Sequence, residues 1–372
     1  MEPSPRSERV AGLDLLRGLV MVLMTLDHSR ALLGAHGDPL DLASTTPAWF
    51  LTRWVTHLCA PTFVALAGIG AALSLPRAGA AGTCRFLWTR GLWLILLEVT
   101  LVNVSWQFGY PSLSLLVIWA LGASMVLLSG LMRLHRLAPL AFGLAVVLGH
   151  DLLAGFRPAE PAWLAAVWGL CVAPGSFHLG ALPVSVAYPC LPWAGVMALG
   201  FAAAPWIAGP AGLRRGRAAA LGGSFLVTFA LLRVLSLYGE PRPWAAQARG
   251  PLTTFLSVLD CTKYPPSLQY LLVTLGLSLL ILVLLDRVGT RSTLGLRVLG
   301  RVPLFYYLLH VPLLHLGARL LVRATLAPGA ELEPSLGRVY LGWVLTLLLL
   351  WPLCRAWDRL KSTRDRWWLR YL

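Results

Sequence analysis

The sequence predicts an all-α membrane protein, a polytopic bundle of about ten transmembrane helices with both termini in the cytoplasm. Of its 372 residues, 57% are hydrophobic and only 13% are charged. The mean hydropathy is +0.71, which excludes an ordinary soluble protein. Lys and Arg number 31 against 16 Asp and Glu. This excess fits loops that face anionic lipid, so membrane lipid is an expected partner and nucleic acid is not.

Apolar runs long enough to cross a bilayer recur along the chain and define the expected spans. The loops predicted to face the cytoplasm are all basic, which orients the chain by the positive-inside rule. Residues 162–173 form an additional candidate surface helix. The runs lie at residues 11–33, 53–75, 86–107, 112–133, 137–154, 187–208, 218–238, 266–286, 302–325 and 337–356.

Three segments divide the chain. Residues 1–12 form a polar cytoplasmic segment, residues 13–356 form the membrane domain, and residues 357–372 form a basic tail. The tail mixes Arg, Lys and Trp, so we expect it to lie on anionic headgroups. Long outward segments rich in Pro, Gly and Trp, of the kind that often carry function, lie at residues 34–52, 155–186 and 239–265.

The first apolar run carries four ionisable residues, Asp14, Arg17, Asp27 and His28. Charge within hydrocarbon is costly, so such residues persist mainly where they act. Arg17 and His28 are eleven positions apart and share one helix face, like two ends of a buried pathway. His28 is a candidate general base. Asp27 points about 100° away and should reach Arg30, another helix or the substrate. A polar helix contact without chemistry is the alternative.

Two further histidines accompany cations. His57 follows Arg53 by four residues at the outer start of the second run, where we expect it close to Asp27. It assists catalysis, binds an acceptor or serves the structure. His310 follows Arg301 by nine residues, and we group both with a donor-binding set. Arg301 with Arg17, Arg85 and Arg90 would form a cytoplasmic cluster for phosphate groups. Positive-inside topology alone is the other reading of each arginine.

Outer loops enter helices at Tyr188-Pro-Cys-Leu-Pro-Trp193 and Lys263-Tyr-Pro-Pro-Ser267. Proline at a helix start and an aromatic belt explain both motifs structurally. Lys263 lies in a predicted outer loop, although basic residues are expected mainly in the cytoplasmic loops. It is therefore a candidate for holding an anionic or polar acceptor. We group Lys263, Tyr264, Trp193 and Arg53 as acceptor-binding candidates.

Other chemistry lacks local support. No Walker loop, dinucleotide-binding unit, HExxH or GxSxG motif is present. The cysteines lack metal-ligand spacing, so no metal site is expected. Cys171, Cys190 and Cys261 fall near outward segments, where either a disulfide or reduced packing residues fit. Glu98 and Asn103 are expected mainly to join helices.

At these motifs the chain resembles the bacterial branch of the heparan-alpha-glucosaminide N-acetyltransferase catalytic-domain family. The similarity covers nearly the whole chain. Asp14, Leu16, Arg17, Gly18 and His28 are also similar to the LDxLRG-like start of the wider membrane acyltransferase superfamily. The matching segments are residues 10–28, 52–61, 188–193, 263–268 and 300–310.

The resemblance implies a multi-pass enzyme of the bacterial inner membrane. It would move an acyl group, in the first instance acetyl, from cytoplasmic acetyl-CoA to an extracytoplasmic hydroxyl or amine of a small molecule, sugar or glycan. The resemblance ties the arginine to acyl-CoA and the histidine to catalysis. The lysosomal heparan enzyme has Asn where His28 stands and uses a loop histidine, which leaves His36 as the other candidate base. A transporter or flippase of a glycan or lipid intermediate is the rival function, and a homodimer is left open.

Overall fold

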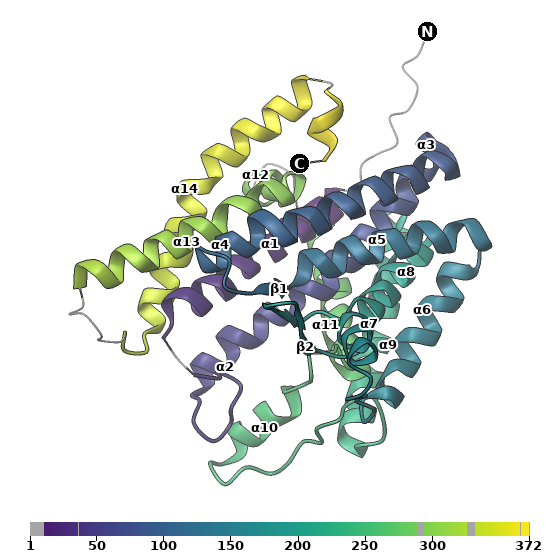
Figure 1. The fold of residues 1–372 in the computed structure, drawn as a ribbon. Coiled ribbons are helices and arrows are strands. Elements are labelled where there is room, and N and C mark those ends of the chain that lie inside the picture. Colours follow the sequence, from purple (N-terminus) through teal and green to yellow (C-terminus); the bar gives the residue numbers. More distant parts are fainter. Residues whose placement is uncertain (1–10, 36, 289–292, 326–331, 365, 372) are drawn as a thin grey trace.

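The protein is a bundle of helices in this computed structural model, which describes residues 11–35, 37–288, 293–325, 332–364 and 366–371 (Figure 1). Each expected apolar run is helical over most of its length. The helices are α1 (Ala11–Leu33), α2 (Pro47–Trp54), α3 (Cys59–Leu97), α4 (Asn103–Gln107), α5 (Val117–Leu134), α6 (Ala138–Gly149), α7 (Ala162–Cys171), α8 (Cys190–Ile207), α9 (Ala211–Leu235), α10 (Pro251–Leu259), α11 (Leu268–Leu285), α12 (Leu294–Arg301), α13 (Pro303–Thr325) and α14 (Leu336–Thr363).

Within the described residues, seven helical stretches are long and apolar enough to cross a membrane. The predicted all-α polytopic class is therefore confirmed. One of the seven, Pro47–Gln107, includes two of the expected runs. The expected runs that fall outside the seven are α1, which carries several charges, and α6, which is short. The surface helix expected at residues 162–173 is α7.

Helix α3 consists of two limbs that meet at Gly79. Gly79 has φ 69° and ψ 170°, a combination that is essentially restricted to glycine. The hydroxyls of Ser74 and Thr83 hydrogen-bond at 3.3 Å, although nine residues of straight helix would separate them by about 13.5 Å. The chain therefore turns back at Gly79, and α3 supplies two passes rather than one.

Helix α1 lies at the centre of the bundle and packs against α3, α11, α12, α13 and α14. Two glycines let α1 and α12 touch backbone to backbone. A Cβ on Gly18 would overlap the carbonyl of Leu296, and a Cβ on Gly300 would overlap that of Asp14. Small residues at such crossings allow close helix contact in membranes. The crossing brings Arg17 to the end of α12, where its guanidinium donates to the carbonyl of Gly300 at 3.1 Å.

A small sheet, which the sequence did not predict, lies on the bundle. Strand β3 (Leu182–Val186) pairs in parallel with β1 (Leu113–Leu115) and antiparallel with β2 (Gly175–Leu179). The run expected to be helical from residue 112 therefore begins as a strand. The buried carboxylate of Glu98 accepts the backbone N–H of Leu116 at 3.2 Å and of Trp119 at 2.9 Å. Glu98 thus caps α5 and fixes its start at Val117, which agrees with the structural role expected for it.

The bundle has two chemically different ends. We call the end that carries Arg17, Arg90, Arg301 and Lys361 the basic end. Figure 1 shows α2 and α10 on the other side of the molecule from α12, and we call that side the opposite end. All six cysteines are free. Cys171 and Cys190 are neighbours, and both are reduced in this structure.

Candidate active site

A pair of buried histidines joins α1 to α13. Nδ1 of His28 lies 2.6 Å from Nε2 of His310, and the two rings stack with centroids 4.9 Å apart. His310 is fully buried. Its Nδ1 lies 3.2 Å from the carbonyl oxygen of Tyr306, one turn earlier on the same helix. The sequence predicted both histidines at membrane depth but not their contact.

The hydrogen bonds assign the tautomers of this pair. A carbonyl oxygen only accepts, so Nδ1 of His310 carries a proton. When both rings are neutral, Nε2 of His310 is then an acceptor and Nδ1 of His28 must donate to it. Nε2 of His28 keeps a lone pair directed away from the pair. This arrangement leaves His28 able to accept a proton at Nε2, and it lets His310 hold the orientation of that ring.

Aromatic rings surround the pair. Trp106 packs edge-on against His28 with centroids 4.8 Å apart. Tyr307 packs edge-on against both imidazoles, at 6.2 Å from His28 and 5.3 Å from His310. The hydroxyl of Tyr306 hydrogen-bonds to that of Thr25 at 2.6 Å. These contacts restrict the rotation of both imidazole rings.

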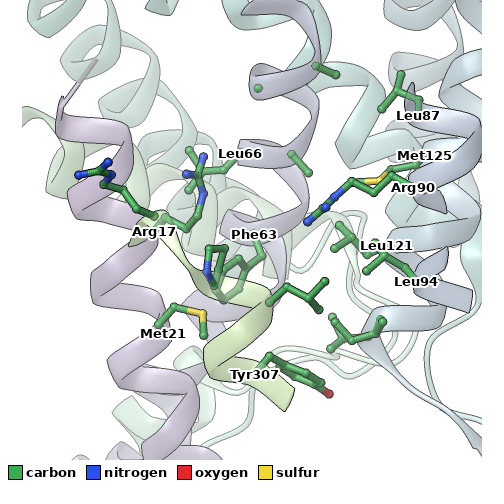
Figure 2. A pocket seen from close by; sticks show the side chains of 18 of the residues that line it. Arg17, Met21, Phe63, Leu66, Leu87, Arg90, Leu94, Leu121, Met125 and Tyr307 are labelled. Atoms are coloured by element: carbon green, nitrogen blue, oxygen red, sulfur yellow. The ribbon is translucent and has the colours of Figure 1, made fainter. Parts of the chain in front are cut away.

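A cavity of about 390 Å³ extends from the basic end toward this pair. Helix α1, both limbs of α3, α5 and α13 form its walls. In Figure 2 Arg17 and Arg90 lie on opposite walls, and Tyr307 lies at a distance from both. The apolar lining includes Met21, Met24, Phe63, Leu66, Leu94, Leu121 and Met125. The volume falls within the range of small-molecule sites.

Four basic side chains line the cavity near the basic end, namely Arg17, Arg90, Arg301 and Lys361. Arg17 pairs with Asp14 at 3.0 Å, and Arg301 pairs with Asp358 at 3.1 Å. Three of the four belong to the predicted phosphate cluster. Lys361 was missed because the sequence placed the tail on the membrane surface. Arg85, the fourth predicted arginine, is exposed and does not line the cavity.

The cavity does not open onto His28. Arg17 lines it and His28 does not. Tyr307 lines its wall and also packs edge-on against His28, so this ring borders both the cavity and the imidazole. Among the residues that the structure describes, Arg17 and His28 therefore do not line one cavity, in contrast to the single pathway expected from the sequence. His310 lies beside His28 rather than among the donor-binding cations with which we grouped it.

Charged residues gather on the other side of His28. The carboxylate of Asp27 pairs with Arg30 at 3.1 Å and with Arg53 of α2 at 2.6 Å. Asp27 therefore reaches both Arg30 and a second helix, as its angle on α1 predicted. His57 is buried near these charges, and its Nε2 has no partner among the described residues. Within the same residues, no hydrogen bond links His57 to His28.

Acceptor-binding candidates adjoin these charges. Lys263 is 7% exposed, and its ammonium lies 5.9 Å from the ring of Tyr188 and 5.1 Å from that of Tyr264. The two tyrosine hydroxyls are 3.3 Å apart. Trp193 is fully buried behind Tyr188, with ring centroids 5.3 Å apart. The structure thus brings Arg53, Lys263, Tyr264 and Trp193 into one region. His36, the alternative base, lies outside the described residues.

Comparison with known families identifies the family to which the chain is similar. The family model described as heparan-alpha-glucosaminide N-acetyltransferase, catalytic, matches residues 9–236, more than half of the chain. None of the curated proteins matches the chain. The matched part includes His28, Arg53 and Arg90, whereas α11 to α14, with His310 and Lys361, lie beyond it.

Proposed function

The chain belongs to the heparan-alpha-glucosaminide N-acetyltransferase catalytic family, and we propose that it takes an acetyl group from acetyl-CoA at the basic end. Membership of this family and the apolar helices together indicate a membrane acetyltransferase. The acceptor is a hydroxyl or amine that arrives from the opposite end. The basic end faces the cytoplasm, since the positive-inside rule places basic loops there.

The cavity matches the chemistry of the donor. Coenzyme A carries several phosphates on its nucleotide end and a long, weakly polar arm that ends in the thioester. Arg17, Arg90, Arg301 and Lys361 supply cations for the phosphates. The apolar walls accept the arm, which places the acyl end toward Tyr307.

His28 supplies the base. Its Nε2 takes the proton from the acceptor O–H or N–H as the acceptor atom bonds to the acyl carbon. The carbon–sulfur bond then breaks, and the departing thiolate takes the proton back from the imidazolium. His310 holds His28 in the reactive tautomer throughout, through the 2.6 Å hydrogen bond between the rings.

The observation that carries this proposal is the His28–His310 pair, placed one ring beyond a cavity lined with cations. The test measures transfer of label from acetyl-CoA to products in vesicles that contain the purified protein. We expect His28→Ala to lower the rate about 10²–10⁴-fold, the contribution typical of a general base. His178→Ala, at an exposed histidine of β2, is the matched control and should keep the wild-type rate.

Two results would reject the proposal. Wild-type rates in His28→Ala would remove His28 from the chemistry. Absence of any acetyl-CoA-dependent labelled product, together with movement of a glycan or lipid across the vesicle, would favour the rival transporter.

A further inference from the structure

Helix α13 carries two exposed arginines, Arg319 and Arg323, toward the opposite end of the bundle. The helix is one of those long and apolar enough to cross a membrane. It begins at Pro303 beside the basic end, and Arg319 follows 16 residues later, which is about 24 Å along the helix axis. The hydrocarbon core of a bilayer is about 30 Å thick. Both arginines therefore lie near its far boundary, at the level of the lipid headgroups.

Neither arginine has an anionic partner in the described part of the chain. Arg319 donates from Nε to Nε2 of His315 at 3.3 Å and from Nη2 to the carbonyl oxygen of Gln107 at 3.4 Å. The N–H groups on Nη1 of Arg319 have no acceptor among the same residues. Free guanidinium donors of this kind suit the oxygens of a phosphate.

Aromatic and polar neighbours hold the guanidinium of Arg319 in place. It lies 4.9 Å from the ring centre of Phe108, and Phe108 stacks on His315 with centroids 4.0 Å apart. Nδ1 of His315 donates to the carbonyl oxygen of Ser105 at 3.0 Å, which leaves Nε2 as the acceptor for Arg319. We call Phe108, His315, Arg319 and Arg323 the Arg319 site. Much of the rotamer freedom of Arg319 is thus already lost before any ligand binds.

Phe108 reaches this stack through an uncommon backbone conformation. It follows the last residue of α4 with φ 46° and ψ 41°, in the left-handed region that residues with a Cβ seldom adopt. Helix α4 packs against α13 (Figure 1). Backbone strain of this kind tends to collect at functional sites, and here it occurs at the residue that supports the guanidinium.

The same face of α13 is also apolar. Leu316, Arg319, Leu320 and Arg323 are spaced three or four residues apart around the helix and share one face. Leu316 is 48% exposed and Leu320 is 55% exposed. A cation beside exposed leucines at headgroup depth matches the two parts of a phospholipid, its phosphate and its acyl chains.

We propose that the Arg319 site binds the phosphate of an anionic phospholipid, whose acyl chains lie along Leu316 and Leu320. Nη1 of Arg319 donates to the phosphate, and Arg323 adds a second cation. Two cations without an anion favour a headgroup with a net negative charge over a zwitterionic one. Phosphates line both surfaces of a bilayer, so this inference depends neither on the orientation of the chain nor on acetyl transfer.

Titration of the purified full-length protein with single lipids tests the proposal. Phosphatidylglycerol and phosphatidylcholine with identical acyl chains are added in detergent, and native mass spectrometry measures the dissociation constant of each. We expect phosphatidylglycerol to bind the wild-type protein more tightly and inorganic phosphate not to displace it. Equal affinity for the two lipids overturns the proposal. Displacement by inorganic phosphate would assign the site to a free anion and would overturn it as well.

A matched pair of variants locates the binding. Arg319→Gln should lower the affinity for phosphatidylglycerol about tenfold to hundredfold, the effect of losing a hydrogen bond to a charged group. Arg157→Gln is the control, because Arg157 is an exposed arginine that donates to the carbonyl of Pro174. It should bind the lipid like the wild type. An equal loss in both variants would indicate attraction by net charge alone, and no loss in Arg319→Gln would place the lipid elsewhere. Either result overturns the proposal.

Two further variants keep the net charge and test the stack itself. Phe108→Leu removes the aromatic face, and we expect the affinity to fall about twofold to fivefold, the contribution of an exposed cation–π contact. Arg319→Lys keeps the charge but lacks the planar group with its Nη1 donors, so its affinity should also fall. These variants decide the matter if Arg319→Gln does not fold. Wild-type affinity in both would show that the stack plays no part, which overturns the proposal.

Discussion

At the residue scale, the hydrogen bond between His28 and His310 determines which nitrogen of His28 carries a proton. His28 acts as a base only if its Nε2 lacks a proton, and that depends on the acceptor that His310 presents to Nδ1. Tyr306 in turn fixes the tautomer of His310 through its carbonyl. The tautomer of the His28 imidazole, on which the proposed base depends, is thus set by a backbone oxygen that contacts His310.

Replacing His310 should therefore lower activity in graded steps. His310→Ala removes the acceptor, and we expect the rate to fall about tenfold to hundredfold, as for other residues that orient a functional imidazole. His310→Gln retains an oxygen acceptor and should keep more of the rate. The measurement is kcat/KM for acetyl transfer against pH. A role in packing alone would lower the rate without moving the pH profile, whereas loss of the hydrogen bond should move it.

Asp27 should be important for stability, because two arginines depend on its carboxylate. Asp27→Asn leaves Arg30 and Arg53 without a counter-charge in a mostly buried region, and we expect a loss of about 3–5 kcal/mol. Chemical denaturation in detergent measures it. The exposed Glu160→Gln is the control and should change stability by less than about 0.5 kcal/mol. Equal small effects in both variants would contradict the prediction.

The sequence located individual residues better than it located their partners. The link between Asp27 and Arg30 followed from their spacing on one helix. The contact between His28 and His310 joins residues 282 positions apart, and no periodicity on either helix encodes it. The position of Lys361 at the cavity was not predicted for the same reason, because only the fold of α14 brings this residue there.

At the scale of elements, the turn between the two limbs of α3 depends on the backbone conformation of Gly79. A Cβ added to Gly79 would meet no atom within 4 Å, so a side chain there would suffer backbone strain rather than a clash. We expect Gly79→Ala to destabilise the protein by about 1–3 kcal/mol. Gly130→Ala, in the interior of α5 and also without close neighbours, should instead stabilise it by about 0.5–1 kcal/mol. Thermal unfolding of both variants checks the opposite signs.

Element boundaries were less predictable than element existence. The apolar run at residues 112–133 reads as one helix, and its composition gives no sign that Leu113–Leu115 forms a strand. Pairing with β3 and capping by Glu98 decide that boundary. Both partners are distant in sequence, so hydropathy alone placed the start several residues early.

At the scale of the whole molecule, the C-terminal tail packs against the basic end. Trp357 stacks on Phe305 with centroids 4.6 Å apart. Leu369 is buried, and the hydroxyl of Tyr371 hydrogen-bonds to that of Thr89 at 2.9 Å. A tail expected on lipid headgroups thus packs on α3 and α13 as part of the cavity wall.

Lys361 should consequently contribute to donor binding. We expect Lys361→Gln to weaken acetyl-CoA binding by about tenfold, the loss of one charge-assisted contact with a phosphate. Titration calorimetry at low and high salt measures the affinity. Arg359→Gln, an exposed residue two positions earlier that does not line the cavity, should bind like the wild type. Equal weakening in the two variants would indicate only a general effect of positive charge.

The packing of Tyr307 against His28 at the cavity wall also bears on energy conservation in the cell. A channel open from end to end would let protons and ions leak down their gradients and waste the membrane potential. Under the proposed function, the acetyl group passes to its acceptor beside Tyr307, and no open pore is needed to move it.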